Sequence, residues 1–566
     1  SHDIFSESSV IRGNPYKASK AFLSAFLRSF STLFFLIEFL PALESIDLPV
    51  VDSNNNTTKS DVFSVVAYHV DLRVQVMPLP ALKELSKEIS SLGFNTLIME
   101  WEATYPYKKH SIISNRYAYS REEISEFINY SEELGLDVIP LQQSLGHVEY
   151  ILMHERYAYL RADKRDLSQI DPTQLDAAKD YFSELFSDVL STHQSEYVHV
   201  GGDETRILDC ERCQEAWGDD GEELGKSKLY VEYMKMIAEI VIEQGKTPLL
   251  WADMILAHPD AITDMPKDII YIDWNYGWKF DRFGENPRTL IEKHGLKFWG
   301  ASSIRSSPDD YHVTSWRKHM NNQAVYASYA RESGFEGMVL TSWSTSGQYG
   351  YEWFWPEVVE LFPLRLVYPH AYPNDAFRMN TLGFIEAVQH EETFKPKDFA
   401  HQYAQQRFGL TARESDKLWS ILTDESLNKN VFIGSLPLSG IKGLPDSENE
   451  VRATLRKIRE LQAGLTKIVP KKNQKEFAHY RLQIDFREYY LRFRQIQYLV
   501  QSADFTEKES HEAVNQLEEL LVRSSELDNR FKKLFTGKLY DAEIERLNQY
   551  RNKKATLLLQ RLTRDR

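Results

Sequence analysis

The chain has 566 residues, of which 42% are hydrophobic and 27% charged, and its formal net charge is −16. This length allows a large buried core and at least one further domain, and the composition is that of a soluble globular protein. The acidic balance argues against nucleic acid as a partner, because its phosphates would be repelled. Nothing in the composition signals a nucleotide or a metal, so we predict no cofactor and no metal site.

Residues 1–60 are predicted to form a helical and linker segment outside the main domain. Apolar residues dominate 21–43, but Arg28 and Glu38 interrupt them. The run is therefore too short to cross a membrane, and an amphipathic helix is expected, with an interfacial membrane helix as the alternative. The chain starts with no visible signal peptide, which leaves two localisations open: export after removal of a leader, or the cytoplasm.

From residue 61 onward, strand-like apolar runs alternate with segments of helical periodicity. Eight strands alternating with helices over about 310 residues favour a (β/α)8 barrel, assigned to 61–375, over a doubly wound open sheet. The predicted strands are 63–70, 95–101, 137–142, 196–201, 247–252, 269–274, 297–301 and 337–343, and the predicted helices include 80–92, 121–134, 174–191, 226–244 and 314–333.

The region 376–566 changes character. Apolar residues recur at helical spacing with dense charge between them in 449–469, 474–503, 507–535 and 541–564. This pattern predicts long antiparallel helices that form a C-terminal domain beside the barrel. No catalytic constellation stands out there, so a structural role is expected, and its surface could also form a homodimer.

The fourth strand ends in the most informative stretch, His199-Val-Gly-Gly-Asp203-Glu204. Two glycines allow a sharp turn, and two adjacent acids follow at the carboxyl end of the strand, where barrel enzymes build their sites. Adjacent acids in different environments can hold different pKa values, as a general acid and its helper require. The plain alternative is a solvated turn or a helix N-terminus, where acidic residues are also favoured.

Every other predicted strand also ends in polar or aromatic residues, which indicates one shared site. The carboxyl ends of all barrel strands lie on one face, so these side chains are expected to meet there. They include His69, Asp71 and Arg73 after the first strand, Glu100 and Glu102 after the second, His147 after the third, Trp251 and Asp253 after the fifth, Trp274, Asn275 and Tyr276 after the sixth, and Trp343 after the eighth.

Cys210 and Cys213 are the only cysteines and follow the acidic pair with Cys-x-x-Cys spacing. A zinc site would need two more ligands, and no histidine stands nearby at metal spacing. A local disulfide or two free thiols are therefore expected.

The stretch His199, Gly201, Gly202, Asp203, Glu204 resembles the His-x-Gly-Gly-Asp-Glu signature of family 20 glycoside hydrolases, the β-N-acetylhexosaminidases. Residues 97–107, 138–150, 274–276 and 341–343 are similar to the hexosaminidase D-like branch of that family. The resemblance covers roughly residues 61–370. It implies removal of terminal β-linked N-acetylglucosamine or N-acetylgalactosamine from a glycan, with the substrate's own 2-acetamido oxygen as nucleophile.

The resemblance also implies roles for individual residues. Glu204 would be the general acid and base, and Asp203 would accept the acetamide N–H and stay ionised. Tyr276 would hold the acetamido carbonyl, and His147 would orient the acid, with Glu100 or Glu102 as its own acidic partner.

The pocket wall and the sugar contacts are assigned in the same way. Trp251, Trp274 and Trp343 would surround the acetamido methyl and the sugar face. Asp253, Asn275, Glu102 and Arg73 would contact substrate. The family's sugar-binding arginine follows an Asp by three residues, whereas Arg73 follows Asp71 by two.

Two other functions stay open. One is a carbohydrate-binding barrel without turnover. The intact Asp203-Glu204 pair and Tyr276 argue against this function. The other is a glycosidase with a conventional carboxylate nucleophile about 5 Å from the acid, for which Glu102 is the candidate.

Overall fold

The computed structural model describes residues 63–564, with gaps at 74–75, 165, 206–207, 278, 281–282, 307–313, 344–376, 391–393 and 429–447. The predicted segment 1–60 and the predicted boundary between 375 and 376 lie outside the described residues. Asp61–Arg566 groups into one compact unit.

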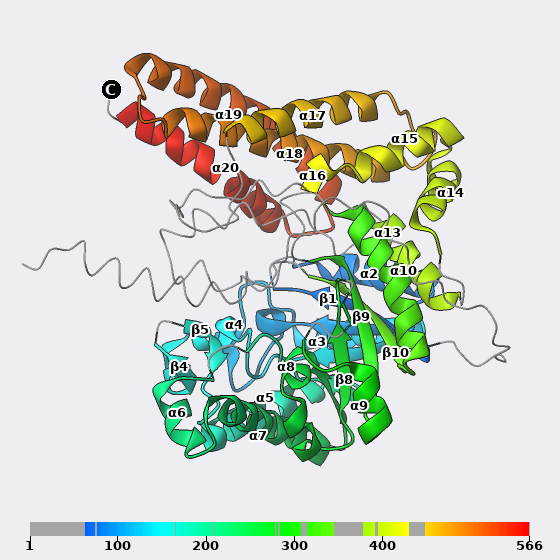
Figure 1. Cartoon of the computed structure of the whole chain (residues 1–566), viewed down its shortest axis with the longest axis vertical. Coiled ribbons are helices and arrows are strands. Elements are labelled where there is room, and N and C mark those ends of the chain that lie inside the picture. The colour runs from blue at the N-terminus through cyan, green and yellow to red at the C-terminus, as the bar shows by residue number, and fades with distance from the viewer. Residues whose placement is uncertain are drawn as a thin grey trace, which may run out of the picture. The chain divides into compact units, whose positions relative to one another are not determined.

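Eight parallel strands close into a barrel (Figure 1), in the spatial order β1-β10-β9-β8-β7-β6-β3-β2. Closure is completed by β1 and β10, which pair from Val65 opposite Gly337 to Tyr68 opposite Leu340. The predicted (β/α)8 barrel is therefore confirmed, and the open sheet is excluded. The strands are β1 (Val65–Asp71), β2 (Thr96–Glu100), β3 (Asp137–Leu141), β6 (Tyr197–His199), β7 (Thr247–Trp251), β8 (Ile270–Trp274), β9 (Lys297–Arg305) and β10 (Gly337–Ser342).

The predicted helices between the strands are also present, and their ends follow local signals. At the start of α3, Ser120 and Glu123 form a capping box that satisfies two backbone N–H groups. The barrel helices are α2 (Leu79–Leu92), α3 (Arg121–Glu133), α5 (Leu175–Leu190), α7 (Glu222–Glu243) and α10 (Trp316–Glu332), with the shorter α4 (Glu149–Leu152), α6 (Glu211–Trp217), α8 (Asp253–Ala257) and α9 (Pro287–His294). A hairpin of β4 (Arg161–Asp163) and β5 (Asp166–Ile170), which was not predicted, stands outside the barrel.

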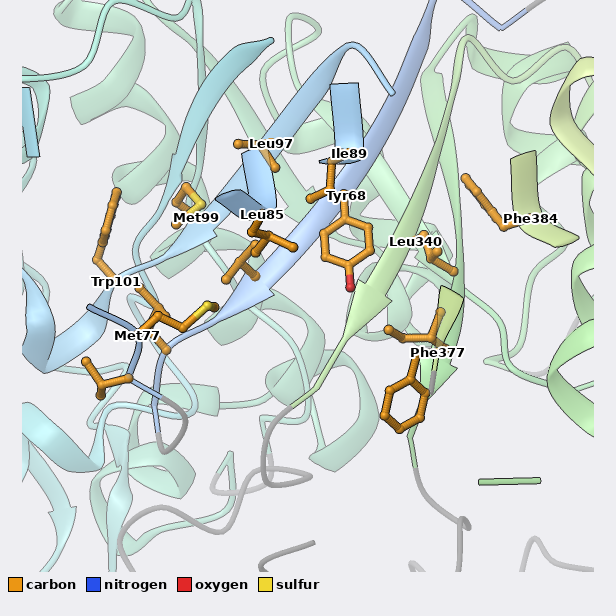
Figure 2. Close-up of a cluster of buried hydrophobic side chains, with 14 of the residues drawn as sticks. Tyr68, Met77, Leu85, Ile89, Leu97, Met99, Trp101, Leu340, Phe377 and Phe384 are labelled. Atoms are coloured by element: carbon orange, nitrogen blue, oxygen red, sulfur yellow. The ribbon is translucent and has the colours of Figure 1, made fainter. Parts of the chain in front are cut away.

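The barrel strands are buried on both faces. On β2, Ile98 points into the barrel, whereas Leu97 and Met99 belong to the core between strands and helices. Figure 2 shows part of this outer core, where Leu85 and Ile89 of α2 lie beside Tyr68 of β1. Alternation with period two therefore builds two apolar layers, which explains why the sequence shows continuous apolar runs.

Helices follow the barrel, as predicted for the C-terminal region. The four long ones lie side by side (Figure 1). They contact the barrel through aromatic rings, such as those of Trp316 in α10 and Tyr480 in α18 (Gln474–Val500), whose centroids lie 5.6 Å apart. Among the described residues, no helix has the length and apolar character needed to span a bilayer. The helices are α13 (Arg378–Gln389), α14 (Pro396–Phe408), α15 (Ala412–Leu422), α16 (Glu425–Asn428), α17 (Glu448–Thr466), α18 (Gln474–Val500), α19 (Glu507–Phe535) and α20 (Asp541–Arg564).

Candidate active site

The chain leaves β6 in a tight turn that requires glycine. His199 is fully buried, and its Nδ1 accepts a hydrogen bond of 3.0 Å from the Gly201 N–H. Burial lowers the pKa of His199 to about 3, so the ring is neutral and can accept this bond. Gly202 has a φ of +95°, and a Cβ atom there would lie 2.6 Å from Leu250 Cδ1. The turn therefore leaves no room for a side chain at Gly202.

Alanine at Gly201 is expected to destabilise the protein by about 3 kcal/mol, and alanine at Gly245 by about 1 kcal/mol. Both glycines have a φ of +74°, so the backbone strain is the same. A Cβ atom on Gly201 would lie 2.0 Å from Gln143 Oε1 and 3.1 Å from Gln143 Cα, whereas one on Gly245 would have nothing within 4 Å. Denaturant unfolding of both variants measures the difference, and equal losses would contradict the crowding at Gly201.

Asp203, Glu204 and His147 form the centre of the candidate site. His147 Nε2 lies 3.4 Å from Asp203 Oδ2 and 3.4 Å from Glu204 Oε2. Glu204 has a φ of 48°, in the left-handed region that non-glycine residues rarely adopt. Two consecutive side chains that would diverge from an extended chain therefore reach the same imidazole. The Asp203 side chain is 8% exposed and that of Glu204 34%, so the pair offers one buried and one accessible carboxylate.

These charges shift two pKa values in opposite directions. Burial alone would lower the pKa of His147, but the Asp203 and Glu204 carboxylates outweigh it and raise that pKa well above its usual value. Burial alone would raise the pKa of Asp203, but the charge and hydrogen bond of His147 lower it. At neutral pH the site therefore holds a protonated imidazole and an ionised Asp203. Asp203 Oδ1 is buried without a hydrogen-bond partner among the described residues.

The His147→Gln substitution is expected to destabilise the protein by about 2–4 kcal/mol in mild acid and by less in alkali, because it removes the cation that lies 3.4 Å from both carboxylates. The His147 pKa is raised, so its contribution is complete below its unfolded pKa of about 6.5 and is lost as pH rises through the folded value. The Asp203 pKa is lowered, so its contribution is complete above its unfolded pKa of about 3.9 and is lost as pH falls through the folded value. The largest difference from wild type therefore lies between about pH 4 and pH 6.5.

Unfolding of wild type and His147→Gln at several pH values measures this trend. The His193→Gln variant is the control, because His193 is also buried but burial lowers its pKa to about 4. Its folded pKa lies below its unfolded value of about 6.5, so burial of the neutral ring opposes folding in acid, and the cost of the His193→Gln substitution should fall as pH drops below about 6.5, opposite to the trend for His147→Gln. A pH-independent loss for His147→Gln would contradict the charged pair.

The loop that carries His147 is held by the unpredicted hairpin. The Val148 N–H donates to the Ser168 carbonyl at 3.2 Å, which ties the segment after β3 to β5. His147 itself has a φ of 54°. A non-glycine residue in this region costs of order 1–2 kcal/mol and persists only where its surroundings fix it.

A second charged cluster lies at the ends of β1 and β2. Arg73 makes two parallel hydrogen bonds to Asp71, from Nε to Oδ1 at 3.0 Å and from Nη2 to Oδ2 at 2.9 Å. Its guanidinium also lies 3.8 Å from Glu100 and 3.9 Å from Glu102. Glu100 lies 3.0 Å from His69 Nε2. The sequence placed His69, Asp71 and Glu100 at the ends of two adjacent strands, but it gave a role only to Glu100, as a possible partner of His147.

The acidic partners of His147 differ from the prediction. Glu100 or Glu102 was expected to pair with this imidazole, but the imidazole lies against the two carboxylates that follow β6. Glu100 pairs instead with His69 of the adjacent strand, and the nearest cation to Glu102 is Arg73. The expected pairing is wrong, although β2 and β6 both flank β3 in the barrel, because the conformation of the loop that carries His147 directs the imidazole toward the β6 side.

Glu102 is a buried acid with unusual backbone geometry. Burial raises its pKa well above the usual range, against the opposing charge of Arg73. Its φ is 43°, and its Oε1 has no hydrogen-bond partner among the described residues. Glu102, His147 and Glu204 are three of the four non-glycine residues with positive φ in the described part of the chain, the other being Asn473. Backbone strain is thus concentrated at this site, as is common at functional sites.

Aromatic side chains lie between the two charged clusters. The Trp251 ring lies 4.3 Å from His199 and 5.7 Å from Trp343, measured between centroids. The Arg73 guanidinium lies 5.4 Å from the centroid of the Trp343 ring. Trp343 Nε1 donates a hydrogen bond of 2.7 Å to the Tyr276 hydroxyl. The structure therefore brings Trp251, Trp343, Tyr276 and Arg73 together.

Tyr276 is held from two sides. Besides Trp343, the Thr341 hydroxyl lies 3.1 Å from the Tyr276 oxygen, and the same hydroxyl lies 3.1 Å from the Ser302 carbonyl. These contacts fix the position of the phenolic oxygen at the end of the ring. The Trp274 ring lies 5.4 Å from the Tyr276 ring, so this predicted wall residue also belongs to the group.

Asp253 and Asn275 were expected to contact the sugar, but both side chains form hydrogen bonds within the protein. Asp253 accepts from the Glu204 N–H at 2.9 Å and from Trp274 Nε1 at 3.1 Å. The Asn275 side chain donates to the Lys279 carbonyl at 2.8 Å and accepts from the Gly277 N–H at 3.1 Å, which stabilises the loop after β8. The periodicity of the sequence does not predict the contacts of Asp253 or those of Asn275.

Cys210 and Cys213 form a disulfide, one of the two states left open by the sequence. Asp171 lies beside them, and the three side chains could together approach a metal ion. The thiolate is the metal ligand of cysteine, so the disulfide does not provide one.

Comparisons with known proteins find a family model, relatives and a solved structure that are similar to this chain. Residues 72–328 match the family model described as the catalytic domain of glycosyl hydrolase family 20. The chain is 28% identical to hexosaminidase D of Bos taurus over 294 residues, which cover 49% of this chain and 83% of that protein. It is 26% identical to hexosaminidase D of Homo sapiens over 309 residues, 51% of this chain and 62% of that protein. A solved β-N-acetylhexosaminidase from Bacteroides fragilis superimposes with a TM-score of 0.44 at 15% identity, covering 61% of this chain and 69% of that one.

Proposed function

Because the chain belongs to glycoside hydrolase family 20, we propose that it is a retaining exo-β-N-acetylhexosaminidase. Its substrate would be a glycan or glycoconjugate that ends in β-linked N-acetylglucosamine or N-acetylgalactosamine. The 2-acetamido oxygen of this sugar would act as nucleophile, with Glu204 as acid and base and Asp203 as the residue that orients the acetamide.

The observation that carries the proposal is the state of Asp203. Its Oδ2 lies 3.4 Å from His147, whereas its buried Oδ1 has no hydrogen-bond partner among the described residues. The lowered pKa keeps the group ionised. A buried, ionised oxygen without a donor is costly unless a ligand provides one. An acetamide N–H is such a donor, and its partial positive charge grows during the reaction, so the attraction is strongest in the transition state.

The reaction then follows from the two carboxylates. The acetamido oxygen attacks C1 as Glu204 gives its proton to the glycosidic oxygen, so the C–O bond breaks and the alcohol leaves. The ionised Glu204 next takes a proton from water, which attacks C1 of the oxazolinium ion and opens its ring. Its side chain is 34% exposed, which leaves access for both steps. Tyr276 would donate its O–H to the acetamido carbonyl and hold it beneath C1.

A conventional nucleophile fits the site less well. Glu102 is the candidate for that role, but its raised pKa favours the protonated form, which cannot attack C1. Its closest cation is Arg73 at 3.9 Å, which does not outweigh the effect of burial.

Wild-type protein is expected to hydrolyse nitrophenyl β-glycosides of N-acetylglucosamine or N-acetylgalactosamine at least about a thousandfold faster than the β-glucoside, which lacks the nucleophile. An N-acetylglucosamine-derived thiazoline, which mimics the bicyclic intermediate, should inhibit at least about a hundredfold more tightly than N-acetylglucosamine itself. Steady-state kinetics measure both. Equal turnover of the glucoside would overturn the mechanism, and binding of these sugars without any turnover would favour a carbohydrate-binding barrel.

A further inference from the structure

Asp253 joins three neighbouring strand exits of the barrel. It follows β7, its Oδ2 accepts from the Glu204 N–H after β6 at 2.9 Å, and its Oδ1 accepts from Trp274 Nε1 at the end of β8 at 3.1 Å. We propose that Asp253 is a positioning residue that fixes the backbone of Glu204 and thereby aims the catalytic carboxyl group. This role rests on the proposed function and adds to it, because it concerns how the acid is held rather than what it does.

Glu204 needs such a support because of its conformation. Its φ of 48° is unfavourable for a residue with a side chain. The hydrogen bond to Asp253 holds the planar peptide group between Asp203 and Glu204, and this plane sets the direction of the N–Cα bond from which the Glu204 side chain starts. His147 lies 3.4 Å from the Glu204 carboxylate. Glu204 is therefore held at its carboxylate by His147 and at its backbone N–H by Asp253.

The surroundings of Asp253 fit a support more closely than a sugar contact. The residue is 5% exposed, and each of its oxygens already accepts an N–H. The titratable groups that influence it are Asp203, Glu204 and Tyr230. Burial, together with the charges of Asp203 and Glu204, raises the pKa of Asp253 to about 8. A largely neutral Asp253 at neutral pH can hold the Glu204 backbone without adding a negative charge beside the ionised Asp203.

The test compares Asp253→Leu, which keeps the approximate size but has no acceptor, with Asp253→Asn, which keeps one acceptor oxygen. Each is assayed on two N-acetylglucosaminides, one with a 4-methylumbelliferyl and one with a 2,4-dinitrophenyl leaving group. The second leaving group departs without a proton, so it does not need a well-aimed acid. For Asp253→Leu we expect a loss in kcat of about a hundredfold with methylumbelliferyl and below about fivefold with dinitrophenyl. Asp253→Asn should recover part of the activity.

A second measurement places Asp253→Leu in a Glu204→Gln background. If Asp253 acts through Glu204, the added loss should be below about threefold, because the group that it aims is already gone. Binding of N-acetylglucosamine by calorimetry should change by less than about threefold in Asp253→Leu, because KM and product affinity do not depend on the acid. Thermal melting followed by circular dichroism identifies a variant that has not folded, in which case Asp253→Asn carries the comparison.

Three results would overturn the inference. They are equal losses with both leaving groups, fully additive losses in the double variant, and a large loss of N-acetylglucosamine affinity, the last of which would mark Asp253 as a sugar-binding residue. Failure of the proposed function has a different signature, since wild type would then turn over neither acetamido glycoside before any variant is compared. That outcome would remove this role for Asp253 as well.

Discussion

The Glu204→Gln substitution is expected to lower kcat/KM for a methylumbelliferyl β-N-acetylglucosaminide by about a thousandfold. Glutamine keeps the shape and the polarity of the side chain but cannot give a proton to the glycosidic oxygen or take one from water. The 34% exposure of the Glu204 side chain and its position 3.4 Å from His147 indicate that the folded structure tolerates the change. Catalysis, rather than stability, should therefore carry the loss.

The leaving group and an added anion separate the two tasks of Glu204. A 2,4-dinitrophenyl glycoside should lose far less in the first step, and azide, which needs no base, should restore turnover and give a β-glycosyl azide. The Glu196→Gln variant is the matched control, because Glu196 directly precedes β6 and lies at the opposite end of that strand from Glu204. Comparable losses at Glu196 and Glu204, or a loss independent of the leaving group, would contradict the assignment of Glu204 as acid.

The Asp203→Asn substitution is expected to lower kcat by about a hundredfold to a thousandfold, with a smaller change in KM. An amide cannot match the charge that develops on the acetamido group, and its NH2 would oppose the acetamide N–H. The buried Oδ1 of Asp203 and its lowered pKa are the features that the substitution removes. Inhibition by the thiazoline should weaken in parallel with kcat, because this compound resembles the charged intermediate.

The Asp137→Asn variant provides the control for Asp203→Asn. Asp137 begins β3, at the opposite end of the barrel from the site, and its Oδ2 accepts from the Ser195 hydroxyl at 2.8 Å. We expect kcat and KM of the Asp137→Asn variant to lie near those of wild type. If Asp203→Asn raised KM and left kcat unchanged, Asp203 would contribute uniform binding and not transition-state stabilisation.

Much of the fold could be predicted from periodicity. The apolar run at 95–101 became β2, and the helical spacing at 121–134 became α3. These predictions succeed because a strand buried on both faces must be apolar throughout, and a helix packed on a barrel must be apolar on one side. The β4–β5 hairpin was missed because its strands are short and stand outside the barrel, where neither constraint acts.

The sequence by itself determined which residues stand at the carboxyl ends of the strands. Asp203, Glu204, Trp251, Tyr276 and Trp343 could be proposed as one group because strand order and chain direction fix the face on which each strand ends. The two glycines before the acids likewise marked a turn that no other residue could make.

Only the tertiary structure decided how those side chains pair. His147 lies against Asp203 rather than Glu100, Asp253 supports the Glu204 backbone, and Asn275 turns to its own loop. Each contact joins loops that are distant in the chain or depends on a loop conformation, and local propensity carries no information about either. The charge states follow from the same cause, because burial and the neighbouring charges, which set the pKa values of the site, exist only once the barrel has closed.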